Sequence, residues 1–222
     1  SHAANGAIVI TTKKGKEGRL SLTVSQNTEF LRPFVTPNFQ NSYGTGDLLS
    51  SAGSVEKSWG NKLNPSNYMG YDPINDFLRT GVVATETVSL STGTEKNQTY
   101  FSASAVNSVG MVPNNDYDRY NFTFRNTTSF LNDKMTLDVS ASYIKQKDQN
   151  MVNQGTYSNP LVTAYLFPRG DDWNEIKMYE RWDTSRNIYT QYWPQGIDTF
   201  TGQNPYWIAY RNLRENNKDR YM

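Results

Sequence analysis

Alternation of polar and apolar side chains is the feature of this 222-residue sequence that most constrains its fold. Because successive side chains of a β-strand point to opposite faces, a period of two predicts a strand with one apolar and one polar face. In the stretch that begins at Met135, the side chains of Leu137, Val139 and Ala141 point to the same face of the strand as that of Met135. Polar residues between them point to the opposite face. The pattern predicts an all-β protein with strands at residues 19–30, 83–92, 99–106, 119–130 and 135–145.

The connections between these strands alternate in length. Residues 93–98 and 131–134 are short polar turns, whereas residues 31–82, 107–118 and 146–222 are long and loop-like. Antiparallel strands joined in this order place the long loops at one end of the sheet and the short turns at the other.

Two architectures fit strands of this kind. A soluble carbohydrate-binding β-sandwich would bury the apolar faces against a second sheet, which would hide Phe122, Leu137 and Val139. A transmembrane barrel would turn the same faces to lipid and line its lumen with the polar ones. The alternating connections, the uniformly polar faces and the aromatic residues near strand ends favour the barrel. These aromatic residues are Phe30, Tyr100, Phe101, Tyr120, Phe130 and Tyr143.

The composition excludes several classes of function. A formal net charge of +1 gives no electrostatic reason to expect nucleic acid as a partner. The chain has no cysteine and one histidine, so thiol nucleophiles and thiolate metal sites are excluded and nucleophilic catalysis has few candidates. We therefore expect no enzyme activity, no metal and no cofactor. No apolar run approaches the roughly 18 residues that a transmembrane helix requires, which excludes a helical membrane protein.

Five strands are too few to close a transmembrane barrel, for which about 8 are needed. An open edge in hydrocarbon would leave backbone groups unpaired at a cost of several kcal/mol each. The first residues, "SHAANGAIVITT", also lack the charged and long apolar segments of a signal peptide. The barrel interpretation therefore predicts that this chain is a fragment of a longer exported protein.

Three segments resemble a known family of transporters. The stretch "AANGAIVITTKKGK" (3–16) resembles the end of the plug domain in SusC/RagA-like TonB-dependent transporters of Bacteroidetes-type bacteria. The stretch "DFLRTGVVATETVSLSTGTEKNQTYFSASAVNSVGMVPNNDYDRYNFTFRN" (76–126) is similar to the first barrel strands of that family, and "NPYWIAYRNLRENNKDRYM" (204–222) to the approach to its next strand. Ala7, where the family usually has Val, and Thr92, where a turn glycine is usual, depart from the pattern.

The resemblance implies a fragment of an active transporter of the bacterial outer membrane. Residues 1–16 would be the C-terminal end of the plug domain, and residues 17–222 the start of a β-barrel of about 22 strands. The extracellular loops would be 31–82, 107–118 and 146–222. The resemblance also implies import of oligosaccharides or peptides with a SusD-like surface lipoprotein, contact with outer-membrane lipid, and a TonB complex that engages parts absent from this chain. A passive porin or adhesin barrel stays open as an alternative, and it predicts that residues 1–12 form a barrel strand.

The long loops carry the candidate contact residues. Exposed aromatic rings stack on sugars or on peptide side chains, so contact with substrate or partner is expected at Trp59, Trp173, Tyr192 and Trp193. The alternative is that these rings pack the loops against each other, because loops of this length must bury something to be ordered.

Other polar residues are expected to have structural roles. Asp172 followed by Glu175 has the character of a capping box and predicts a helix at 172–182, whose acidic residues form a solvated face rather than a metal site. Arg125 and Asp138 are expected to face the lumen and to join a polar network in the barrel.

Overall fold

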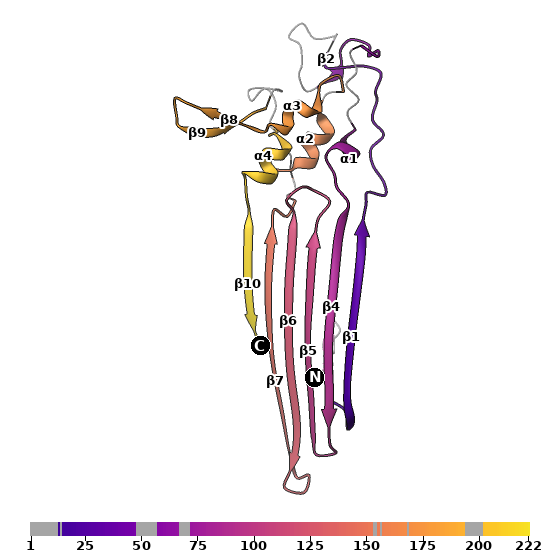
Figure 1. Cartoon of the computed structure of the whole chain (residues 1–222), viewed down its shortest axis with the longest axis vertical. Helices are drawn as coiled ribbons and strands as arrows, with labels where there is room; N and C mark the ends of the chain where they lie inside the picture. The colour runs from indigo at the N-terminus through magenta and orange to yellow at the C-terminus, as the bar shows by residue number, and fades with distance from the viewer. Residues whose placement is uncertain are drawn as a thin grey trace, which may run out of the picture.

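The structure is a computed structural model that describes residues 13, 15–47, 57–66, 72–152, 155, 157–167, 169–193 and 202–222. Six long antiparallel strands form one sheet, which we call the wall (Figure 1). Their order across the wall is β1 (Gly18–Leu31), β4 (Gly81–Gly93), β5 (Asn97–Val109), β6 (Asp116–Phe130), β7 (Met135–Gln149) and β10 (Glu215–Tyr221). The prediction of an all-β protein is confirmed.

Each strand predicted from alternation lies inside a longer strand of the wall. The extra residues are mainly at the loop end, where polar side chains occupy both faces and the period of two is lost. For the same reason the single loop expected at 146–222 is wrong at both of its ends. β7 continues to Gln149, and the polar segment Glu215–Tyr221 pairs with it as β10. The loop expected at 107–118 shortens to 110–115, because β5 and β6 continue to pair up to Val109 and Asp116.

The long and short connections lie at opposite ends of the wall, as Figure 1 shows. At the turn end, β4 and β5 are joined through residues 94–96, and β6 and β7 through residues 131–134. Gly93 is required at the first turn, because a Cβ there would lie 2.6 Å from the carbonyl oxygen of Asn97. The other connections all lie at the opposite end, which we call the loop end.

The loops fold into a compact unit over the loop end of the wall (Figure 1). We call the described residues of 32–80, 110–115 and 150–214 the cap. The cap contains α1 (Pro73–Asp76), α2 (Pro160–Leu166), α3 (Trp173–Lys177), α4 (Pro205–Tyr210) and a short parallel pair, β2 (Gly46–Asp47) with β3 (Ser58–Trp59). Its buried core is made of Phe77, Val112, Ala164, Phe167, Trp173, Ile176 and Trp193.

The helices of the cap begin where the sequence supplies a capping residue. Asn159 and Asn204 accept a hydrogen bond from the second backbone N–H of α2 and α4, and a proline follows each at the first helical position. Asp172 caps α3 in the same way, as the sequence predicts. The helix predicted at 172–182 nevertheless ends at Lys177, because the residues after it leave the helix and pair as a strand.

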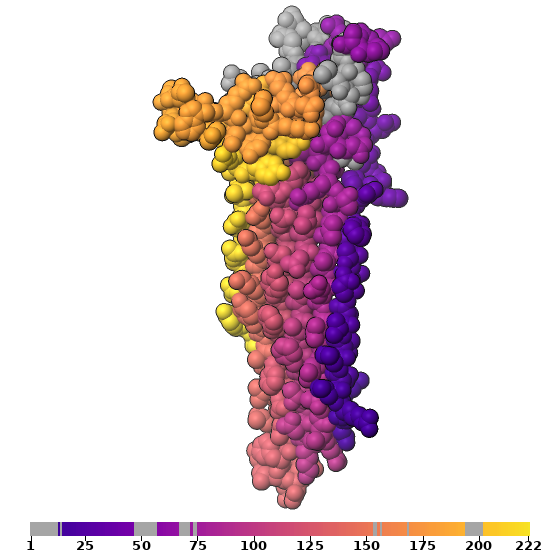
Figure 2. All heavy atoms as spheres, viewed as in Figure 1, coloured from indigo at the N-terminus to yellow at the C-terminus, as the bar shows by residue number. Residues whose placement is uncertain are grey.

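That strand is β8 (Glu180–Asp183), which forms a hairpin with β9 (Ile188–Gln191). We call this hairpin the arm. It projects sideways from the cap beyond the edge of the wall, as the space-filling view in Figure 2 shows. Among the residues that the structure describes, no helix has the length and apolar content needed to cross a bilayer.

Candidate functional site

One face of the wall carries a continuous apolar band. The strand register aligns apolar side chains of neighbouring strands into rows that cross the wall. One row is Leu22–Leu90–Phe101–Phe124–Ala141, and the next is Val24–Val88–Ala103–Phe122–Tyr143–Tyr221. The alternation seen in the sequence is therefore kept in register from strand to strand.

In the part of the chain that the structure describes, no segment covers the apolar band. Phe122, Leu137 and Val139 are 43%, 53% and 46% exposed, so the second sheet that a β-sandwich requires does not lie over them. Among the described residues, therefore, nothing supports the soluble sandwich. A contiguous apolar surface of this kind marks contact with a partner or with a membrane.

The opposite face of the wall is lined by hydroxyl, amide and charged groups. The rows here are Ser21–Ser91–Tyr100–Arg125–Ser140 and Thr23–Ser89–Ser102–Thr123–Ser142. Arg125 and Asp138 form the expected ion pair on this face, with Nε of the arginine donating to Oδ1 at 2.9 Å. Such a face suits contact with water and with polar ligands.

The segment before β1 reaches the wall from its polar face. The backbone N–H of Lys16 donates to Oγ of Ser91 at 3.0 Å. Gly15 lies directly against β5, since a Cβ there would be 2.6 Å from the backbone nitrogen of Thr99. Residues 1–12, which the passive-barrel alternative predicts to form a barrel strand, lie outside the described residues. Gly15 and Lys16 lie along the polar side of the wall.

The apolar band has a limited height. On β7 it covers the nine positions from Met135 to Tyr143, or about 27 Å along the strand. A membrane-spanning strand needs about 9–11 residues. Closer to the loop end the same face becomes charged. Lys145 is the next residue after Tyr143 on this face of β7, and Lys147 follows it in register with Asp118. The band therefore has the size of a hydrocarbon layer and is bounded by charge on the side of the cap.

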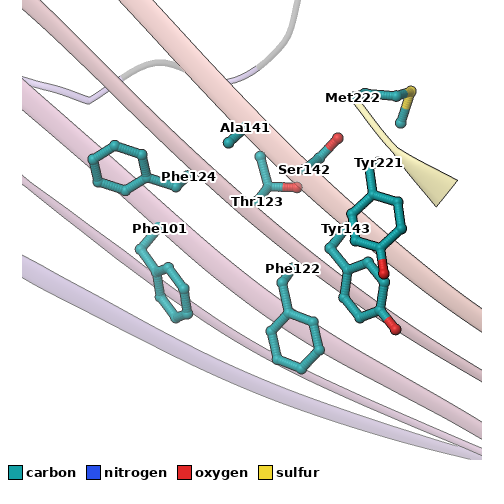
Figure 3. A pocket seen from close by; sticks show the side chains of 9 residues that line it. All are labelled: Phe101, Phe122, Thr123, Phe124, Ala141, Ser142, Tyr143, Tyr221 and Met222. Atoms are coloured by element: carbon teal, nitrogen blue, oxygen red, sulfur yellow. The ribbon is translucent and has the colours of Figure 1, made fainter. Parts of the chain in front are cut away.

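Large rings and small residues shape a groove in this band. The groove has a volume of about 370 Å³ and is walled by Phe101, Phe122 and Phe124, and Ala141 lies beside Phe124 on the neighbouring strand (Figure 3). At its upper end the ring of Tyr143 stacks on those of Phe122 and Tyr221, at centroid distances of 6.3 and 4.9 Å. A surface grooved in this way accommodates a hydrocarbon chain.

Asparagine side chains fasten the cap to the wall. The buried Asn150 donates from Nδ2 to the carbonyl oxygens of Ala209, at 2.9 Å, and Asn114, at 3.1 Å. Its Oδ1 accepts from the backbone N–H of Arg214 at 2.9 Å. Asn115 Nδ2 in turn donates to the carbonyl oxygens of Gln149 and Asn150. We call these contacts the asparagine staple; they hold the 110–115 loop, the end of β7 and the start of β10 together.

The aromatic residues proposed as contacts separate into two groups. Trp173 and Trp193 are 3% and 7% exposed and belong to the core of the cap. Trp173 donates from Nε1 to the hydroxyl of Tyr206, whose pKa is raised by burial, so that group stays protonated and donates to Asp76 O. These two tryptophans therefore pack the loops against each other, which is the alternative to contact with substrate or partner.

The other two candidates are accessible. Trp59 is 61% exposed and lies beside Tyr43, with ring centroids 6.3 Å apart. Tyr192 is half-buried; Arg181 lies over its ring at 3.5 Å, and its hydroxyl donates to Glu175, which raises the tyrosine pKa. Sequence reasoning missed Tyr43 as a neighbour of Trp59, because backbone pairing between two loop segments, including β2 with β3, brings them together, and no local pattern predicts it.

No protein-family model matches the chain. Over 154 residues, which are 67% of the chain, the sequence is 27% identical to the TonB-dependent receptor SusC of Bacteroides thetaiotaomicron. The chain is distantly similar to a TonB-dependent receptor. The matched segment spans 14% of the length of that receptor, so the chain corresponds to a small part of it.

Proposed function

We propose that this chain is part of a SusC/RagA-like TonB-dependent transporter in the bacterial outer membrane. Residues 1–16 end the plug domain, and residues 17–222 begin the barrel. The observation that carries the proposal is the two-faced wall, whose exposed apolar band is as tall as a hydrocarbon layer and whose other face is polar. An exposed apolar band is unfavourable in water and favourable in lipid.

The unpaired edges of the wall support a closed barrel in a longer protein. β1 pairs only with β4, and β10 only with β7, among the described residues. Backbone groups on such edges have no partners in hydrocarbon, so further strands must pair with them. In transporters of this class the barrel has about 22 strands, and its curvature puts the polar face toward the lumen.

The connector before β1 supports a plugged barrel rather than a passive porin or an adhesin. Lys16 contacts the polar face at Ser91, so the chain passes to β1 from the side of the lumen. A plug domain that fills the lumen would be joined to the barrel in this way. A TonB complex at the inner membrane would act on parts of the protein that this chain does not contain.

The cap is proposed to lie outside the cell. Loops at the end of the wall beyond its charged rows would meet substrate and a SusD-like lipoprotein, which closes over the substrate as a lid. We propose Trp59, which is exposed, and Tyr192, which is half-buried, as contacts, and assign Trp173 and Trp193 to packing. The substrate class is oligosaccharides or peptides.

A pair of substitutions in β7 of the complete protein tests the orientation of the wall. Val139→Arg puts a charge at the centre of the apolar band and should destabilise assembly in lipid vesicles by about 2–4 kcal/mol. Ser142→Arg puts the same side chain on the polar face, in register with Thr123, and should leave assembly unchanged within about 0.5 kcal/mol. Equal effects of the two substitutions would contradict the proposed membrane-facing surface.

A further inference from the structure

A pocket of about 400 Å³ lies where β1 and β4 join the cap. It is lined by Arg32, Pro33, Asn75, Leu78, Arg79 and Thr80. These residues come from two short segments, one that leaves the wall and one that returns to it. The pocket is separate from the aromatic residues that we propose as substrate contacts.

Both arginines of the pocket are held in place through Nε. Arg32 Nε donates to Oγ1 of Thr80 at 3.2 Å, and Arg79 Nε donates to the carbonyl oxygen of Gly110 at 2.9 Å. Arg79 Nη2 also lies 3.5 Å from a carboxylate oxygen of Asp116. Fixing Nε orients a guanidinium plane, and the terminal nitrogens of Arg32 make no hydrogen bond to any residue in the described ranges.

The two arginines of the pocket have one ion-pair partner between them among the described residues. None of its lining residues is acidic, and Asp116 is the one carboxylate that pairs with either arginine among the described residues. The nearby Asp72 and Asp76 accept hydrogen bonds within their own segment, from Asn75 Nδ2 and from the backbone N–H of Asp72. Two guanidinium groups facing one space are stabilised by a bound anion.

The register places the pocket on the outward side of the wall. Phe30 and Val82 are paired and lie on the face of the apolar band. Arg32 follows Phe30 by two positions, and Thr80 precedes Val82 by two positions. The hydrogen bond between Arg32 and Thr80 agrees with this placement. The pocket thus faces away from the lumen, beyond the charged rows that bound the band.

We propose that this pocket binds a phosphate group carried by a saccharide or lipid at the membrane surface. Guanidinium groups bind phosphate through paired, charge-assisted hydrogen bonds, and the Thr80 hydroxyl and Asn75 amide add neutral polar groups to the lining. The membrane location rests on the proposed function, whereas recognition of phosphate rests on the pocket alone.

Binding of glucose 1-phosphate and of inorganic phosphate to the complete protein in detergent tests the recognition step by calorimetry. Arg32→Gln should weaken binding about tenfold, since it removes one charged donor pair. Arg32→Lys should give an intermediate loss, because lysine keeps the charge without the planar fork. Arg186→Gln, in the exposed turn of the arm, is the matched control and should bind as the unchanged protein does. Equal affinity of the Arg32→Gln variant, or absence of phosphate binding in the unchanged protein, would overturn the proposal.

A second measurement identifies the source of the phosphate. In nanodiscs that contain phosphatidic acid and phosphatidylcholine, native mass spectrometry should detect retained phosphatidic acid that is lost with Arg32→Gln. Retention of the lipid assigns the pocket to a headgroup, and binding of glucose 1-phosphate alone assigns it to a soluble sugar phosphate. Both results support phosphate recognition. If the unchanged protein bound neither phosphatidic acid nor glucose 1-phosphate, phosphate recognition would be refuted. Failure of the Val139→Arg test would instead refute the membrane orientation, with phosphate binding in detergent still measurable.

Discussion

Replacing Asn150 by alanine should release part of the cap from the wall. This side chain is 6% exposed and makes three hydrogen bonds of the asparagine staple, to Asn114, Ala209 and Arg214. Its backbone has φ of 51°, a left-handed conformation that asparagine tolerates better than alanine does. The substitution therefore acts on the hydrogen bonds and on the backbone together.

The size of the effect follows from the groups that lose a partner. The Arg214 N–H has no other acceptor among the described residues, which costs about 1–3 kcal/mol for a partly buried donor. The carbonyl oxygens of Asn114 and Ala209 keep Gln149 Nε2 and Asn114 Nδ2 as donors, so each loses about 1 kcal/mol. Alanine in the left-handed region adds about 1 kcal/mol. Local opening of the cap should become easier by about 4–6 kcal/mol in total.

Hydrogen exchange of the complete protein measures this opening directly. Amides of residues 203–214 should exchange about a thousandfold faster in Asn150→Ala, up to the limit set by unfolding of the whole cap. Asn150→Gly should show a smaller loss, because glycine removes the backbone cost and leaves only that of the missing hydrogen bonds.

Asn187 provides a matched control. It has φ of 55° in the exposed turn of the arm, and its side chain makes no hydrogen bond to the described residues. Asn187→Ala should cost about 1 kcal/mol, and its effect should stay within the arm. If Asn150→Ala accelerated exchange in residues 203–214 no more than Asn187→Ala does, the staple would not fasten the cap and the reasoning would be refuted.

Three further substitutions or conditions probe the cap. The hydrogen bond and positive charge of Arg211 lower the pKa of Glu180, so the pair stabilises the arm above the ordinary carboxyl pKa, and that contribution is lost as pH falls through the lowered value. Hydrogen exchange in the arm, corrected for intrinsic rates, should show this transition in the unchanged protein and not in Glu180→Gln. Gly110→Ala should destabilise the cap by about 1–3 kcal/mol, because its Cβ would lie 1.9 Å from Oδ1 of Asn115; denaturant melts of the cap measure this. Trp173→Ala should cost the cap about 3–5 kcal/mol in the same assay.

The sequence was sufficient to predict the wall because one local property determines it. A period of two requires only that neighbours along the chain alternate, and each predicted strand lies within an observed one. β10 was not predicted as a strand, since Glu215–Tyr221 is polar on both faces and carries no alternation. Segment Glu215–Tyr221 becomes a strand because the edge of β7 supplies its backbone with hydrogen-bonding partners. No local sequence pattern predicts that this edge is available.

The cap was less predictable because its order comes from contacts between distant segments. Trp173 packs against Phe77 and Phe167, and no spacing in the sequence joins these three residues. The starts of α2 and α4 could have been found, since Asn-Pro at 159–160 and 204–205 is a signal for a capped helix. The asparagine staple could not, because an asparagine in a polar loop looks the same whether it is buried or exposed.

The apolar residues of this chain fall into two groups that gain stability in different surroundings. Those of the cap, such as Phe167 and Ile176, are buried against each other, so the hydrophobic effect stabilises the cap in water. Those of the wall, such as Leu22 and Val139, stay exposed, and they are favourable only where lipid or detergent covers them. A soluble protein would have no reason to keep the second group bare, and a chain wholly within a membrane would have no reason to build the first. The combination agrees with the proposed function, in which the chain passes from a bilayer into water between Tyr143 and Asn150 along β7.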